Sequence, residues 1–272
     1  MRRTWQLMTV LIFLAWSVGA EGAETLKVVA GSSLVEDIVR DLTGGQVTMV
    51  TVIPGSSCPG QTDLKATDLA FAASAEVALV HQFQMSMPEV KGLLAAANLQ
   101  LRVEALAIPG AWTIPSVQED ATRRIGQILT AIRPALGADI QRRTVTRLAR
   151  IATARREAEL RLAPLAARPV LASAMQTEFL RWAGLTVVRE YGRAEDLTPR
   201  DLVRLMKTAR GTRIAGVVDN LQSGAEAGRP LADELRVPHV VLSNFPGAWA
   251  GSEDYFGLLQ ENVRRLAALA VR

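Results

Sequence analysis

The feature that most constrains the fold is a long helical segment that interrupts a regular alternation of short apolar and helical segments. Residues 138–165 contain no glycine, carry apolar residues at helical spacing and place many arginines on the other face. At 1.5 Å per residue, a helix of this length would be roughly 40 Å long. The segment is therefore expected to span two lobes rather than to lie within one.

On both sides of this segment, strand-like apolar runs alternate with helical runs. This order predicts, in each half of the chain, a parallel sheet with helices on both faces. Ser32 or Ser33 is expected to cap the first helix, which should end at the Gly44-Gly45 pair. Strands are predicted at 26–31, 47–53, 77–80, 99–107, 169–174, 186–190, 214–218 and 239–242, and helices at 34–42, 66–75, 88–97, 116–132, 138–165, 176–183, 199–209, 225–235 and 254–270.

The predicted fold class is α/β, with two lobes that each contain a mostly parallel sheet flanked by helices, joined by a long connecting helix. The expected boundaries are 24–137 for the N-terminal lobe (N-lobe), 138–166 for the connecting helix and 167–272 for the C-terminal lobe (C-lobe). We expect a monomer whose lobes close only modestly, because a long helix resists hinge bending better than flexible crossover strands do.

The first twenty residues have the pattern of a secretory signal peptide. Arg2 and Arg3 are followed by the apolar run 7–16 and by small residues up to Ala20. The apolar run is too short to anchor the chain in a membrane, which needs roughly 18 apolar residues. We therefore expect residues 1–20 to be removed and the protein to be secreted into the periplasm.

Composition excludes several classes of protein. Hydrophobic residues make up 49% of the chain and charged residues 21%, which indicates a globular protein. The net charge of +4 is small and no lysine-rich tract concentrates it, so nucleic-acid binding is not expected. The chain contains none of the familiar nucleophile-elbow, zinc-protease, Walker or dinucleotide-binding motifs, which argues against an enzyme.

Ligands of open parallel sheets bind beyond the carboxyl ends of the strands, so the loops at those ends carry the candidate residues. Cys58 lies in one such loop and is either an inert small residue or a soft thiolate ligand or reactive thiol in the cleft. His81 follows a strand, and with Met85 and Met87 it would form a soft copper(I) site, although methionines at this spacing more often pack. His239 is expected to be structural.

Acidic residues occur near the predicted strand ends at three places. Glu36 and Asp37 are expected to be solvent-facing or capping carboxylates, as are Asp63 and Asp68. The loop at 219–223 instead offers an acid, two amides and a hydroxyl directly after a strand, which suits hydrogen bonding to a polar ligand.

With these elements placed, the chain resembles the metal-type solute-binding proteins of bacterial ABC importers, the zinc- and manganese-binding family called cluster A-I. The resemblance covers essentially the whole mature sequence. It rests on VVAGSSLVEDIVRDLTGG, VTMVTVIPGSS, AWTIP, VVLSNFPG and NVRRLAAL. It implies two α/β lobes joined by a rigid helix, a metal ion bound between the lobes, and an ABC permease with its ATPase as partner.

The family's four metal ligands do not carry over to this chain. Its first histidine follows a proline, where Pro59 precedes Gly60 here, and its second falls in the stretch where Pro109 precedes Gly110. The positions of the third and fourth ligands fall near Ser173 and near Ser243 or Asn244. Asp219 matches the position of an acidic residue, which alone cannot hold a transition metal tightly.

The substitution of these four metal ligands indicates either that the protein binds a different ligand or that the site no longer binds one. The residues that replace the family's ligands in the predicted cleft are Cys58, Gln61, Trp112, Met175, Gln176, Asp219, Asn220, Gln222 and Asn244, and the soft ligands for a metal ion would be Cys58, His81 and Met175. The cargo is then a soft transition-metal ion, a metal complex or a small organic molecule. Trp112 either forms a wall of the cleft or anchors packing at the start of a helix.

The leading functional prediction is the solute-binding component of an ABC importer, without catalysis of its own. The alternative is a periplasmic metallochaperone or thiol-dependent interaction protein that uses Cys58 without a permease. An enzyme with Cys58 as nucleophile would need His81 as its base, because the sequence offers no other plausible partner.

Overall fold

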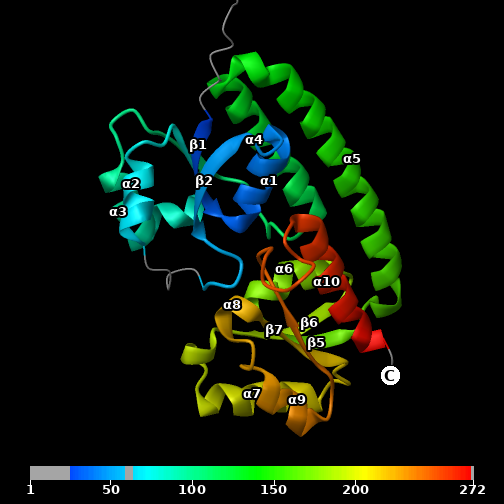
Figure 1. The fold of residues 1–272 in the computed structure, drawn as a ribbon. Helices are drawn as coiled ribbons and strands as arrows, with labels where there is room; N and C mark the ends of the chain where they lie inside the picture. The colour runs from blue at the N-terminus through cyan, green and yellow to red at the C-terminus, as the bar shows by residue number, and fades with distance from the viewer. Residues whose placement is uncertain (1–24, 59–63, 271–272) are drawn as a thin grey trace, which may run out of the picture.

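The computed structural model describes residues 25–58 and 64–270. The predicted signal peptide and Gln61 lie outside the described residues. The N-lobe is at the top of Figure 1 and the C-lobe at the bottom, and the helix α5 (Gly137–Leu162) runs along one side of both. The predicted fold class is confirmed, whereas the exact boundaries of the two lobes stay a prediction.

Each lobe contains a sheet of four parallel strands, and the two sheets have the same strand order. The order is β2-β1-β3-β4 in the N-lobe and β6-β5-β7-β8 in the C-lobe. The strands are β1 (Leu26–Ser32), β2 (Val47–Ile53), β3 (Val77–His81), β4 (Arg102–Leu106), β5 (Pro169–Ser173), β6 (Thr186–Tyr191), β7 (Gly216–Asn220) and β8 (His239–Leu242).

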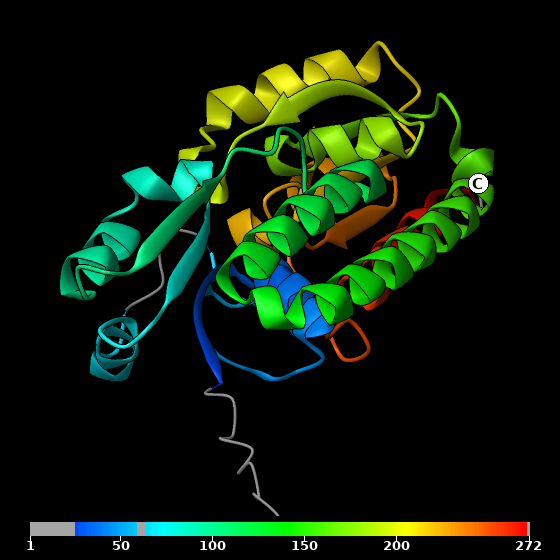
Figure 2. The same cartoon turned by 90° about the horizontal axis from the view of Figure 1, so that it is seen from above.

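Helices cover both sheets, as Figure 2 shows from above. In the described residues they are α1 (Ser33–Thr43), α2 (Ala66–Ala72), α3 (Pro88–Ala96), α4 (Pro115–Ile132), α5, α6 (Thr177–Trp182), α7 (Pro199–Arg210), α8 (Leu221–Gly224), α9 (Arg229–Leu235) and α10 (Tyr255–Ala267). None of these helices is both long enough and apolar enough to cross a membrane.

One hydrophobic cluster runs through both lobes. It includes Val28 of β1, Ile151 of α5, Val170 of β5 and Tyr255 of α10. Figure 1 shows α10 lying against α5, so the end of the chain packs on the connecting helix. A second cluster lies within the C-lobe, under α7 and α9. The lobes therefore share apolar packing as well as a covalent connection, which supports the expectation of modest closure.

Three sequence expectations about segment ends are corrected. Ser32 ends β1 and precedes α1, but its hydroxyl makes no capping hydrogen bond. β4 begins at Arg102 rather than 99, because the Asn98 side chain donates to the carbonyls of Ala73 and Ala75 and holds the preceding residues in a turn. The helix expected at 225–235 begins only at Arg229, where proline follows at the second position and favours a helix start.

Asp37 also differs from expectation. Arg147 of α5 is only 1% exposed, and its guanidinium bridges Asp37 at 2.6 Å and Asp41 at 2.9 Å. Asp37 in turn accepts from the backbone nitrogen of Tyr255 at 3.3 Å. Burial raises the pKa of Asp37, against the opposing effect of Arg147. Asp37 is therefore not a solvent-facing carboxylate but part of a buried junction between α1, α5 and α10.

Candidate functional site

A cavity of about 740 Å³ lies between the lobes, at the carboxyl ends of β3 and β4. Most of its walls come from the N-lobe, and Asn244 and Phe245, which follow β8, close it from the C-lobe. The position is the one expected for a ligand of open parallel sheets. The residues that line it are Leu34, His81, Gln82, Phe83, Leu106, Ala107, Ile108, Pro109, Gly110, Ala111, Trp112, Thr113, Asn244 and Phe245.

His81 is the last residue of β3 and is held in place by its neighbours. Its Nε2 lies 2.7 Å from the hydroxyl oxygen of Ser32, which ends the adjacent strand β1. Its backbone nitrogen donates to Gln84 Oε1, and Gln84 Nε2 donates to the carbonyl of Gly31. A Cβ at Gly31 would lie 2.2 Å from Gln84 Oε1, so this interlocking requires glycine there.

The imidazole of His81 is neutral at neutral pH. Burial lowers its pKa to about 4. Its ring meets Trp112 edge to face, with 4.2 Å between ring centroids, and stacks on Phe83 at 5.4 Å. Met85 and Met87 pack against the hydrophobic core, which is the alternative that the sequence favoured over a copper site. The His81 side chain thus forms part of an aromatic wall.

Trp112 fulfils both alternatives given for it. Its side chain is buried in the large hydrophobic cluster and also lines the cavity. Its carbonyl accepts from Gln118 Nε2 at 2.9 Å, which ties the loop to the first turns of α4. This anchoring gives the cavity a rigid wall.

The C-lobe presents a polar edge, centred on Gln222. Gln222 Nε2 donates to the carbonyl of Gly55 at 2.8 Å and to the hydroxyl of Ser243 at 2.7 Å. Its Oε1 accepts from the backbone nitrogen of Asn244 at 3.1 Å and from Asn220 Nδ2 at 3.3 Å. Because Gly55 belongs to the N-lobe, the Gln222 side chain bridges the lobes, and its hydrogen-bonding capacity is used within the protein.

Gln176 and Asn244 form a second polar contact at this edge. Gln176 Nε2 donates to Asn244 Oδ1 at 2.9 Å, and Asn244 Nδ2 donates to the backbone carbonyl of Met175 at 3.4 Å. Gln176 Oε1 and Asn220 Oδ1 are buried and accept no hydrogen bond from the described part of the chain. The Met175 side chain is 47% exposed and does not line the cavity.

Asp219 lies away from this edge, because β7 continues to Asn220 instead of ending at Val218 as expected. Its carboxylate accepts from Tyr191 Oη at 2.6 Å and from the backbone nitrogen of Gly228, and it contacts His239 Nε2 at 2.6 Å. Burial and the Asp219 charge raise the pKa of Tyr191 far above its usual value. Asp219 is thus committed to a network inside the C-lobe, and His239 is structural, as expected.

Cys58 is half-buried and faces the other lobe. The guanidinium of Arg193 lies 3.5 Å from its sulfur atom. Neither Cys58 nor Met175 lines the cavity that His81 lines. The metal site of Cys58, His81 and Met175 stays a prediction. Among the described residues, no group of three or more His, Cys, Asp and Glu side chains is placed to hold a metal ion.

The sequence missed the apolar part of the cavity. Phe83, Leu106, Ile108 and Phe245 line it, whereas the predicted site residues are Trp112 and polar or sulfur-containing side chains. The sequence did contain a signal for this apolar lining. Phe83 and Ile108 occur in segments that directly follow strands, where apolar side chains are not needed to pack within the sheet. Of the predicted site residues, the structure brings His81, Trp112 and Asn244 to the cavity, with Gln176 behind Asn244.

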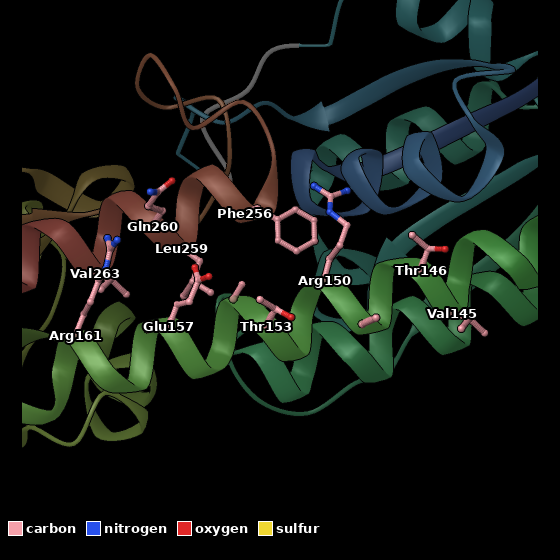
Figure 3. Close-up of a pocket in the computed structure, with 13 residues that line it drawn as sticks. Val145, Thr146, Arg150, Thr153, Glu157, Arg161, Phe256, Leu259, Gln260 and Val263 are labelled. Carbon is pink, nitrogen blue, oxygen red and sulfur yellow. The ribbon is translucent and has the colours of Figure 1, made fainter.

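A second cavity, of about 710 Å³, is a groove between α5 and α10 (Figure 3). Figure 3 shows Phe256 and Arg150 side by side, and the Arg150 guanidinium lies 4.0 Å from the Phe256 ring centroid. The groove is lined by two helices and lies away from the strand ends. The inter-lobe cavity is therefore the candidate ligand site.

Comparison with known proteins agrees with this architecture. The sequence profile of the family described as zinc-uptake complex component A, periplasmic (ZnuA) matches residues 28–269. The chain belongs to the ZnuA family. ZnuA-type proteins bind a metal as a solute and are not enzymes. Among curated proteins, no sequence gives a significant match.

Solved structures show the same fold at low sequence identity. A crystal structure of ZnuA has a TM-score of 0.78 at 16% identity, over 91% of this chain and 100% of that one. A zinc-bound deletion mutant of ZnuA gives 0.76 at 17%, over 92% and 99%. The manganese-bound periplasmic metal-binding protein from Candidatus Liberibacter asiaticus gives 0.75 at 12%, over 90% and 99%. The family resemblance drawn from the sequence is confirmed.

Proposed function

We propose that the protein is the solute-binding component of an ABC importer in the periplasm, and that it binds its ligand in the inter-lobe cavity through a non-standard site. The observation that carries the proposal is the cavity at the carboxyl ends of β3 and β4, closed by Asn244 and Phe245 of the C-lobe. Proteins of this family work with a permease and its ATPase, and the signal-peptide pattern at residues 1–20 supports export.

The chemistry of the cavity favours a metal complex or a small organic molecule over a bare metal ion. Of the described residues that line it, only His81 is of a type that coordinates transition metals well, and its Nε2 is engaged by Ser32. A zinc site commonly needs three or four such ligands. Cys58 is another predicted metal ligand, but the positive charge of the neighbouring Arg193 guanidinium opposes the binding of a cation there.

The first experiment measures metal. The mature chain, purified without a histidine tag, is analysed for metal content and then screened by thermal shift against zinc, manganese and copper salts. We expect well under one metal ion per chain and no large shift with any salt. Stoichiometric, high-affinity zinc would contradict the non-standard site.

The second experiment measures coupling to a transporter. The mature chain is added to proteoliposomes that hold the ABC permease and ATPase encoded beside its gene. We expect ATP hydrolysis to rise. Absence of such genes, together with metal transfer that Cys58→Ser abolishes, would favour the thiol-dependent metallochaperone instead.

A further inference from the structure

We propose that the inter-lobe cavity selects an uncharged, mostly apolar small molecule that carries an aromatic ring. This inference rests on the proposed function and names the class of ligand. The cavity volume of about 740 Å³ falls within the range of about 300 to 1,000 Å³ that is usual for small-molecule sites. It is far larger than the coordination sphere of a single ion.

The described walls of the cavity carry no acidic side chain and, apart from His81, no basic one. Among the described residues, none of those that line the cavity is Asp, Glu, Lys or Arg, and the Nε2 atom of His81 is engaged by the hydroxyl of Ser32. An ion that left water for such a cavity would lose its hydration without gaining a partner of opposite charge. The Glu178 carboxylate comes near Gly110 but is not part of the lining. A charged ligand is therefore disfavoured.

The walls of the cavity are mostly aromatic and aliphatic. Phe83, Trp112 and Phe245 come from three different loops and line one cavity, together with the aliphatic side chains of Leu34, Leu106 and Ile108. Aromatic side chains offer flat faces and polarised edges, which favour stacked or edge-to-face contact with a ring. Phe83 is 54% exposed, so much of its ring is in contact with water. Burial of apolar surface is favourable, and a bound ring would cover this surface.

A few polar groups also line the cavity. Asn244 is held by Gln176 on one side and by the Met175 carbonyl on the other, so its orientation is fixed before a ligand binds. A small number of fixed polar groups in an apolar cavity orients a ligand and contributes specificity. The ligand would thus present one polar edge to the C-lobe and its ring to the N-lobe.

The test uses three probes that share one bicyclic ring and differ in charge. These are quinoline, N-methylquinolinium and quinoline-6-carboxylate, added at pH 7.5 to the mature chain after it has been unfolded and refolded to remove any retained ligand. Binding is measured by calorimetry. We expect saturable one-to-one binding of quinoline, at least about tenfold tighter than binding of either charged probe.

Three variants test whether quinoline binds in the inter-lobe cavity. Phe83→Asp places a charge in the wall at an exposed position that the fold tolerates, and it should weaken quinoline binding about tenfold or more. A folded Trp112→Ala variant should also bind quinoline about tenfold or more weakly. Leu160→Asp, at a position on α5 that is 77% exposed and outside the cavity, is the matched control and should leave binding unchanged.

Three results would overturn the inference: no saturable binding of quinoline, equal binding of a charged probe, or full retention of binding in Phe83→Asp. Failure of the ligand class can be separated from failure of the proposed function. If the mature chain still stimulates its permease while quinoline does not bind, only the class of ligand is wrong.

Discussion

The two lobes have the same strand order, yet their carboxyl edges differ in chemistry. The N-lobe edge carries an aromatic and aliphatic wall around His81 and Trp112, and it is open to a cavity. The C-lobe edge carries amides and hydroxyls around Gln222 that bond mainly to one another and to Gly55. The same backbone arrangement thus supports an open apolar surface in one lobe and a closed polar network in the other. Strand order therefore places the loops at each edge, whereas the residues of those loops set the chemistry of the edge.

Arg147, at the junction of α1, α5 and α10, offers the strongest test of whether the two edges are held in a fixed relation. Arg147→Ala should lower the free energy of unfolding by about 3 to 5 kcal/mol, because it leaves Asp37, whose side chain is only 12% exposed, without its ion-pair partner. Chemical denaturation provides the measurement. Arg142→Ala, at an exposed position on the same helix, should change the value by less than about 1 kcal/mol. Equal effects of the two variants would show that the buried junction does not hold the lobes.

The N-lobe edge can be probed by pH. The pKa of His81 is lowered from 6.5 in the unfolded chain to about 4 in the folded protein. Below pH 6.5 the unfolded chain binds a proton that the folded protein does not, so stability is lost as pH falls toward 4. The difference corresponds to about 3 kcal/mol at most.

The measurement is the free energy of unfolding at several values between pH 7.5 and 4, compared with that of His81→Gln. The variant keeps a polar side chain beside Ser32 but does not titrate, so its stability should depend less on pH over this range. Parallel curves for the two proteins would contradict the buried, neutral state of His81.

The C-lobe edge is probed by Gln222→Ala. The change leaves the Gly55 carbonyl and the Asn244 backbone nitrogen without their partner, which should cost about 1 to 3 kcal/mol. Gln260→Ala, at an exposed position on α10, is the matched control and should be nearly neutral. If Gln222→Ala were also neutral in thermal unfolding, the polar edge would not be the closed network that distinguishes the C-lobe.

Much of the architecture was predictable from the sequence because it depends on local periodicity. The predicted helix 138–165 matches α5 to within a few residues, since apolar spacing without glycine specifies a long helix in any context. The alternation of strands and helices likewise predicted parallel sheets. The predictions failed where a single residue decides the end of a helix or strand. For example, β7 continues through Asp219, and the carboxylate of this residue lies in the C-lobe interior.

The sequence by itself determined the two-lobed α/β fold and the family, because these depend on periodicity and on residue identity. Only the tertiary structure decided which loop residues share the cavity, that Asp219 and Gln222 are occupied within the protein, and that Arg147 is buried. The physical reason is that a hydrogen bond or ion pair between residues a hundred positions apart depends on distances that no local pattern specifies.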